Sequence, residues 1–161
     1  MNQPMSKTMT ALTRSIVVAF AVSLLALCGA HAQGAKPHRI AIQVDQNDPA
    51  VMNLALNNAE NIIEYYRDKG EDVDVEIVAY GPGLNMLRAD TSPVKDRIAR
   101  LASSDATFPA KIAFSACNNT LQGMEKREGH AITIVPQAKI VPAGVVRLSE
   151  LEERGWSYIR P

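Results

Sequence analysis

The sequence predicts an α/β protein in which a mostly parallel five-stranded sheet carries helices on both faces. Short segments of alternating apolar and polar residues, typical of strands, are interleaved with longer segments whose apolar residues have helical spacing. The helical segments are long enough to cross between neighbouring parallel strands. Because no internal repeat or interdomain linker interrupts this pattern, we expect a single domain.

The first half of the pattern contains two strands and two helices. Residues 39–45 and 73–79 alternate as strands. Asp48 followed by Pro49 is a helix start, and Gly70 ends that long helix. A turn-rich loop over residues 80–87 leads to a second helix that begins at Ser92-Pro93. The predicted buried positions are Val51, Leu54, Ala55, Ala59, Ile62, Ile63 and Tyr66 on the first helix, and Val94, Ile98 and Leu101 on the second.

The second half predicts three more strands and two more helices. Residues 111–115 form a short strand, and a helix follows over residues 118–127 with Gly129 at its end. A fourth strand is expected over residues 130–135, ending at Pro136. The chain then closes with a helix over residues 145–154 and a strand over residues 156–159.

The first thirty-two residues have the pattern of a cleavable export signal. Lys7 and Arg14 precede an uncharged apolar stretch over residues 16–27, and Ala30 and Ala32 are small residues at the two positions that a signal peptidase reads. The stretch is shorter than the roughly 20 residues of a membrane-spanning helix. We therefore expect cleavage after Ala32 and a periplasmic or secreted protein that begins at Gln33, without stable membrane insertion.

Two alternatives for this segment are an uncleaved anchor and a lipid anchor on Cys28. Lipidation requires a small residue immediately before the cysteine, and Leu27 occupies that place. The exported chain of 129 residues is long enough to bury a core without disulfides. It carries fifteen Lys and Arg against seventeen Asp and Glu, so it lacks the positive charge that nucleic acid or an anionic membrane would require.

Cys117 is the one cysteine that remains after cleavage, so no intrachain disulfide can form in an oxidising compartment. It follows the third strand and precedes Asn118, Asn119 and Thr120, which are good capping residues for a helix. A thiol at a helix N-terminus faces unpaired N–H groups, which lower its pKa. Cys117 is therefore the candidate catalytic residue, and an inert buried cysteine is the alternative.

Loops that follow the first two strands should lie at the same edge of the sheet as Cys117. If their glycines approach the thiol closely, Gly83→Val should slow its modification with little change in fold. Alternatively, the glycines form only an ordinary turn, and the acidic residues and Asn47 only cap backbone N–H groups. The predicted pocket residues are Asp45, Asn47, Tyr80, Gly81, Gly83, Asn85, Asn118, Asn119 and Thr120.

Other chemistry has little support in the sequence. His38 and His130 have no metal-ligand spacing to each other or to Cys117, so we expect neither a metal site nor a Cys-His dyad. No C-x-x-C, G-x-S-x-G, Walker or G-x-G-x-x-G motif occurs. No cofactor is expected.

Three segments occur in a characteristic order: FSACNNTL at residues 114–121, VPAGVV at residues 141–146, and GWSYIRP at residues 155–161 after Leu151. Together with VAYGPG at residues 78–83, they resemble the exported branch of the DsrE/DsrF-like sulfur-relay family. The resemblance covers nearly the whole exported chain.

The resemblance implies a three-layer α/β/α sandwich that assembles into trimers or hexamers. It also implies a sulfurtransferase-like carrier in which Cys117 accepts sulfane sulfur as a persulfide and passes it to the thiol of a partner protein. We then expect the thiol to react below neutral pH and to be labelled quickly by a modest thiol reagent. The alternatives are a non-catalytic oligomeric module that binds a small ligand or a partner, with Cys117 merely packed, and a structural protein with an interchain disulfide.

Overall fold

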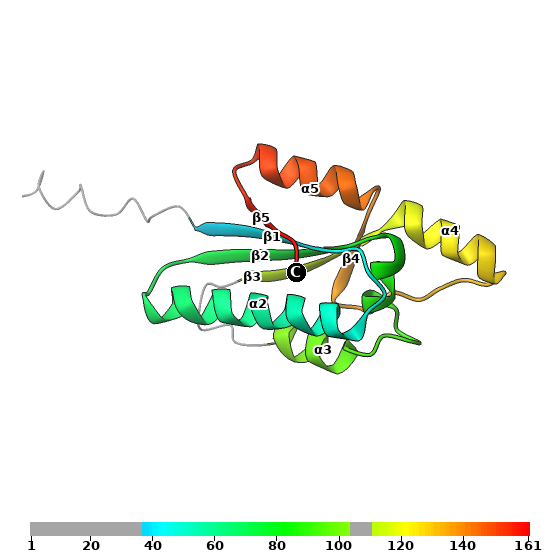
Figure 1. Cartoon of the computed structure of the whole chain (residues 1–161), viewed down its shortest axis with the longest axis horizontal. Helices are drawn as coiled ribbons and strands as arrows, with labels where there is room; N and C mark the ends of the chain where they lie inside the picture. The colour runs from blue at the N-terminus through cyan, green and yellow to red at the C-terminus, as the bar shows by residue number, and fades with distance from the viewer. Residues whose placement is uncertain (1–36, 104–110) are drawn as a thin grey trace, which may run out of the picture. The chain divides into compact units, whose positions relative to one another are not determined.

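All five strands run parallel in one sheet, in the order β4-β3-β2-β1-β5 (Figure 1). The computed structural model describes residues 37–103 and 111–161. The strands are β1 (His38–Val44), β2 (Val73–Ala79), β3 (Lys111–Cys117), β4 (Ala138–Val141) and β5 (Ser157–Ile159). The helices are α2 (Pro49–Asp68), the 3-10 helix η1 (Gly81–Leu87), α3 (Lys95–Ser103), α4 (Asn118–Glu128) and α5 (Gly144–Glu153).

Helices cover both faces of this sheet, which confirms the predicted three-layer sandwich. Figure 1 shows α2 and α3 on one side of the strands and α5 on the other. The face beneath α2 and α3 holds the larger core, with Ile42, Ile77 and Phe114 at its centre. The face beneath α5 holds a small separate cluster of Ala41, Val78, Leu148 and Leu151.

The predicted start and end of α2 are confirmed. Asp48 is the N-cap, and its Oδ1 accepts a hydrogen bond of 2.8 Å from the backbone N–H of Ala50. Pro49 is the first helical residue, and Gly70 adopts a left-handed conformation with φ of 67° just beyond the end.

The buried face of α2 differs in part from the prediction. Leu54 is 45% exposed, whereas Met52 and Leu56 are fully buried. Met52, Ala55, Leu56 and Ala59 share one stripe of the helix, and Leu54 lies about 100° around the axis from its neighbour Ala55. Ile98 and Leu101 on α3, and Val94 just before it, are buried as predicted, although the helix begins only at Lys95.

The predicted fourth strand at residues 130–135 is wrong. That segment forms a single antiparallel bridge, Arg88 with Ile134, and strand β4 begins only at Ala138. Ile132 and Val135 are nevertheless buried in the larger core, which explains their strand-like apolar spacing. β4 starts after Pro136 because Ala138 is the residue that pairs with Phe114 of β3.

The loop predicted at residues 80–87 is largely the 3-10 helix η1, which packs Leu84, Met86 and Leu87 into the core. Other boundaries agree with the predictions to within about two residues. The export signal, its cleavage after Ala32 and Cys28 lie outside the described residues. No helix among the described residues is long and apolar enough to cross a membrane.

Candidate functional site

Cys117 ends strand β3 and is the N-cap residue of α4, at the carboxyl edge of the sheet where a parallel α/β fold gathers its loops. It pairs in register with Val141 of β4. The residue is a free cysteine within the described chain and is only 5% exposed. The residue therefore lies almost entirely beneath the surface.

Hydrogen-bond donors from two helix N-termini face the sulfur. Burial raises the pKa of the Cys117 thiol, but hydrogen bonds from the Thr120 hydroxyl and from the backbone N–H groups of Gly144, Thr120 and Asn119 outweigh it. The pKa of the thiol therefore lies below its ordinary value. Asn119 and Thr120 belong to the first turn of α4, and Gly144 is the first residue of α5.

Thr120 and Asn119 also tie the thiol to neighbouring loops. The Thr120 Oγ1 accepts a hydrogen bond of 2.9 Å from the backbone N–H of Gly81. The backbone N–H of Asn119 donates to the carbonyl of Pro142 at 3.3 Å. The loop after β2 and the connection from β4 to α5 are thus both fixed against the start of α4.

The prediction that residues 118–120 cap α4 is wrong. These residues are the first three of the helix, and Cys117 itself is the N-cap, with no side-chain cap hydrogen bond. The N-cap lies one residue before the predicted capping residues. The prediction missed it because a thiol is a poor capping group and cysteine is not counted among capping residues. The N–H groups that a better cap would satisfy are left to face the sulfur.

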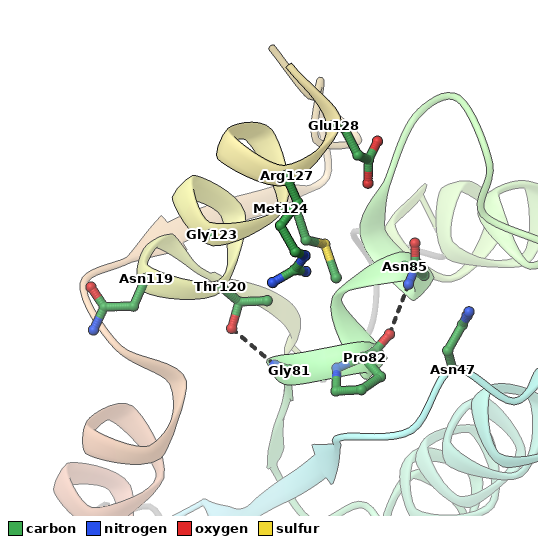
Figure 2. A pocket seen from close by; sticks show the side chains of 10 residues that line it. All are labelled: Asn47, Gly81, Pro82, Asn85, Asn119, Thr120, Gly123, Met124, Arg127 and Glu128. Atoms are coloured by element: carbon green, nitrogen blue, oxygen red, sulfur yellow. Dashed lines mark hydrogen bonds between the residues drawn. The ribbon is translucent and has the colours of Figure 1, made fainter. Parts of the chain in front are cut away.

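A cleft of about 450 Å³ lies between α4 and the segment that begins at Gly81 (Figure 2). Cys117 does not line it, but Asn119 and Thr120, which donate to the sulfur, do. Figure 2 shows Thr120 directed toward Gly81 across one end of this cleft. Thr120 thereby belongs to both the cleft wall and the surroundings of the sulfur. The lining residues are Asn47, Gly81, Pro82, Asn85, Asn119, Thr120, Gly123, Met124, Arg127 and Glu128.

Five of the predicted pocket residues line this cleft: Asn47, Gly81, Asn85, Asn119 and Thr120. The remaining four do not: Asp45, Tyr80, Gly83 and Asn118.

Asp45 forms an ion pair of 3.0 Å with Arg160, near the C-terminus. Burial raises the pKa of Tyr80, and Asp45, Tyr158 and Cys117 raise it further, so these groups lie close enough to interact. Tyr80 therefore keeps its proton at neutral pH. Both residues lie at the same edge of the sheet as the thiol.

The expectation that Gly83→Val would slow modification of the thiol with little change in fold is contradicted in its second part. Gly83 is buried, and a Cβ at this position would lie 2.3 Å from the carbonyl oxygen of Val44 and 2.6 Å from its carbonyl carbon. Because both contacts are with the backbone of β1, a side chain there would displace the strand. Gly83 serves close packing of η1 against the sheet.

Two groups of residues were missed in the sequence. Gly144 faces the thiol, and a Cβ on it would meet the Tyr80 Cβ at 2.7 Å, so only glycine fits. Pro82, Gly123, Met124, Arg127 and Glu128 complete the cleft. Helical periodicity could have placed residues 120, 123, 124 and 127 on one face of α4, since they are three or four apart.

The two histidines have other partners. The His38 ring stacks on Tyr66 with 3.9 Å between ring centroids, and its Nε2 lies 3.0 Å from the Glu71 carboxylate. His130 Nδ1 lies 3.0 Å from the carbonyl oxygen of Ala131. Among residues 37–103 and 111–161, no group of three His, Cys, Asp or Glu side chains could hold a metal ion.

Fold and site together define a parallel α/β/α sandwich with a buried, hydrogen-bonded thiol at its carboxyl edge. No protein-family model matches the chain, and no curated protein matches it. Among solved structures it is similar to the protein of unknown function MTH1491 from Methanobacterium thermoautotrophicum, at 28% identity and a TM-score of 0.64. The match covers 77% of this chain and 99% of that one, so it supports the fold and leaves the function to the site.

Proposed function

We propose that the protein is a sulfur carrier of the DsrE/DsrF-like kind, with Cys117 as the residue that holds the sulfur. The observation that carries the proposal is the group of hydrogen-bond donors around the sulfur, which lowers the pKa of the thiol although the thiol is buried. A thiolate is the nucleophile in exchange between sulfur atoms.

The proposed reaction exchanges one sulfur–sulfur bond for another. The Cys117 thiolate attacks the outer sulfur of a donor persulfide, the bond inside the donor breaks, and the donor leaves as a thiolate. The product is a persulfide on Cys117, whose terminal sulfur is later attacked by an acceptor thiolate. Cys117 then leaves as a thiolate, and the two steps together involve no net oxidation or reduction.

The burial of Cys117 limits the donor to a small or extended group. Because Cys117 as a whole is only 5% exposed, we expect an unbranched persulfide to reach its sulfur more easily than a bulky aromatic disulfide. We therefore expect rapid labelling of Cys117 only by small thiol reagents, because the size of the reagent as well as the thiolate fraction decides the labelling rate. The neighbouring cleft, with Thr120 in its wall, is the route by which we propose that the donor approaches.

The test uses the full chain with Cys28→Ser, which leaves Cys117 as the single cysteine. After incubation with inorganic polysulfide and desalting, intact mass should show the addition of one or more sulfur atoms. A second, low-molecular-weight thiol should then remove them. The matched control, which also carries Cys117→Ser, should gain nothing.

A protein that stays unmodified while folded, and gains sulfur only after unfolding, would contradict the proposal. In that case the second candidate function applies, a binding module in which Cys117 is packed. The cleft of about 450 Å³ favours this alternative, because amide groups and Arg127 offer hydrogen bonds to a polar ligand. An interchain disulfide has less support, since Cys117 is buried and poorly placed to reach another chain.

We further propose that the chain acts after export and as an oligomer. Amino-terminal sequencing of the purified protein should give Gln33 as the first residue, and an intact Met1 or a lipidated Cys28 would contradict this. Exposed apolar side chains at Ile140, Val145 and Val146 are available for contacts between copies.

A further inference from the structure

A buried charged cluster lies on the α5 face of the sheet, on the same side as Cys117. Its centre is the carboxylate of Glu76 on β2, a residue that is 2% exposed. Glu76 Oε1 accepts hydrogen bonds from Ser115 Oγ at 2.6 Å and from Arg147 Nε at 2.7 Å. Its Oε2 accepts from Arg147 Nη2 at 2.7 Å, and Lys139 Nζ lies 3.5 Å away.

Stability alone is a poor reason for such a cluster. Removing a carboxylate from water is costly, and apolar residues of similar size often serve as well or better. Val78, the next residue of β2 on the same face, is a fully buried apolar residue of the kind expected in a parallel sheet. Glu76 is also held ionised, because hydrogen bonds from Arg147 and Ser115 outweigh the effect of burial and lower the pKa of its carboxyl group.

The cluster connects β2 to three elements near the thiol, which are β3, β4 and α5. Ser115 precedes Cys117 by two residues on β3, so both side chains lie on the same face of the sheet. Lys139 pairs in register with Ser115 from β4. Arg147 belongs to the first turn of α5, where its backbone N–H donates to the carbonyl of Ala143 at 2.9 Å.

The two hydrogen bonds from the Arg147 guanidinium to the Glu76 carboxylate therefore fix the first turn of α5 over the sheet. Gly144, one turn before Arg147, begins that helix and packs so closely on Tyr80 that no Cβ would fit. A bidentate arginine–carboxylate pair fixes orientation as well as distance. A small rotation of this turn would move the N–H of Gly144 away from Cys117.

We infer that Glu76 and Arg147 are positioning residues for Cys117, since their ion pair holds the N-terminus of α5 against the sulfur. This inference builds on the proposed function, because it names what holds the α5 hydrogen-bond donor against the carrier thiol. It can fail independently, since thiol ionisation and sulfur transfer are measured separately.

Other charged and titratable groups at this end of the sheet include Tyr80, Asp45, Tyr158 and Arg160, together with Arg127 and Glu128 in the cleft. Asp45 and Arg160 are paired at 3.0 Å. The Tyr158 hydroxyl donates to Gln43 Oε1 at 2.6 Å. None of these residues is changed in the variants below, so their effect on the thiol is constant.

The decisive variant is the double substitution Glu76→Gln with Arg147→Gln, in the full chain that also carries Cys28→Ser. It removes the ion pair but leaves the net charge unchanged and no unpaired charge buried. The ionisation of Cys117 is followed by the pH dependence of its ¹³Cβ chemical shift, which reports on the thiol whether or not a reagent can reach it. We expect the midpoint to move to higher pH.

A helix N-terminus stabilises an adjacent thiolate, so losing that interaction lowers the thiolate fraction. We expect the rate of Cys117 alkylation near pH 6 to fall by roughly two- to fivefold. A second variant, Arg147→Lys, keeps the charge but cannot make the bidentate pair with Glu76. It should move the midpoint of the Cys117 titration in the same direction. The matched control is Glu60→Gln with Arg97→Gln, which removes an ion pair of 2.7 Å between α2 and α3. That control should leave the midpoint unchanged.

An unchanged or lower midpoint in a folded double variant, with only the melting temperature reduced, would overturn the inference and leave the cluster a structural one. Should the double variant fail to fold, the same result in Arg147→Lys would overturn it. If the midpoint shifts as expected but wild-type protein takes up no sulfur, the positioning role stands and the proposed function fails. If sulfur uptake occurs without the shift, only the positioning role fails.

Discussion

The two faces of the sheet are built from different kinds of residue. Beneath α2 and α3, the strands present Ile42, Ile77 and Phe114, each almost completely buried among other apolar side chains. Beneath α5, the apolar residues are few, and the strands also present the polar or reactive side chains of Gln43, Glu76, Ser115 and Cys117. This difference indicates that one face supplies most of the folding free energy, while the other holds loops and helix ends in place around the thiol.

The largest expected effect lies on the apolar face. Leu56→Ala should lower the free energy of unfolding by about 2–5 kcal/mol, because Leu56 is fully buried and its removal leaves a cavity. Leu54→Ala, the same substitution on the exposed side of α2, should change stability by only about 0.5 kcal/mol. Denaturant unfolding measures both. Equal losses would mean that α2 does not pack as described.

The next effect concerns the close contact between η1 and β1. Gly83→Ala should cost roughly 1–3 kcal/mol, because its Cβ would meet the backbone of Val44. Gly123→Ala is the matched control, since the nearest atom to its Cβ, outside the backbone of α4, is Arg127 Nη1 at 3.8 Å. Removing a helical glycine should there raise stability by about 0.5–1 kcal/mol. A Gly83 variant as stable as wild type would contradict the described packing.

The smallest effect on stability, and the most informative on chemistry, is expected at Thr120. Thr120→Val removes the hydroxyl that donates to Cys117 and accepts from Gly81, at a cost of about 1 kcal/mol. Since that hydroxyl lowers the pKa of the thiol, its loss should raise the pKa and reduce the thiolate fraction at neutral pH. Thr120→Ser keeps the hydroxyl and should retain the wild-type titration. An identical Cys117 titration in both variants would contradict a role of the Thr120 hydroxyl in lowering the thiol pKa.

The apolar face could be predicted from the sequence because periodicity reports burial directly. The alternating strands and the Asp48-Pro49 start of α2 are confirmed. Periodicity also explains the errors. Leu54 is apolar but lies beside the buried stripe, and residues 130–135 have strand-like spacing because Ile132 and Val135 enter the core from an irregular segment.

The site was predicted only in part, because its contacts join residues far apart in the chain. Cys117 and Thr120 could be placed together from local sequence, since they are three residues apart. Gly144 reaches the thiol only through the parallel pairing of β3 with β4, and Glu76 contacts Arg147 across 71 residues. No local pattern carries such information, so glycine at 144 and glutamate at 76 gave no signal of their roles.

The central claim is that Cys117 is a reactive thiolate in the folded protein, and the pH dependence of its sulfur uptake tests this most directly. The single-cysteine chain is mixed with a small persulfide donor between pH 5 and 9, and the intact mass is followed with time. We predict that uptake persists below neutral pH. The pH at which uptake reaches half its limiting rate should lie below the pKa of a free thiol, which is roughly 8.5. A folded protein that takes up no sulfur at any pH, or one that follows the titration of a free thiol, would contradict the claim.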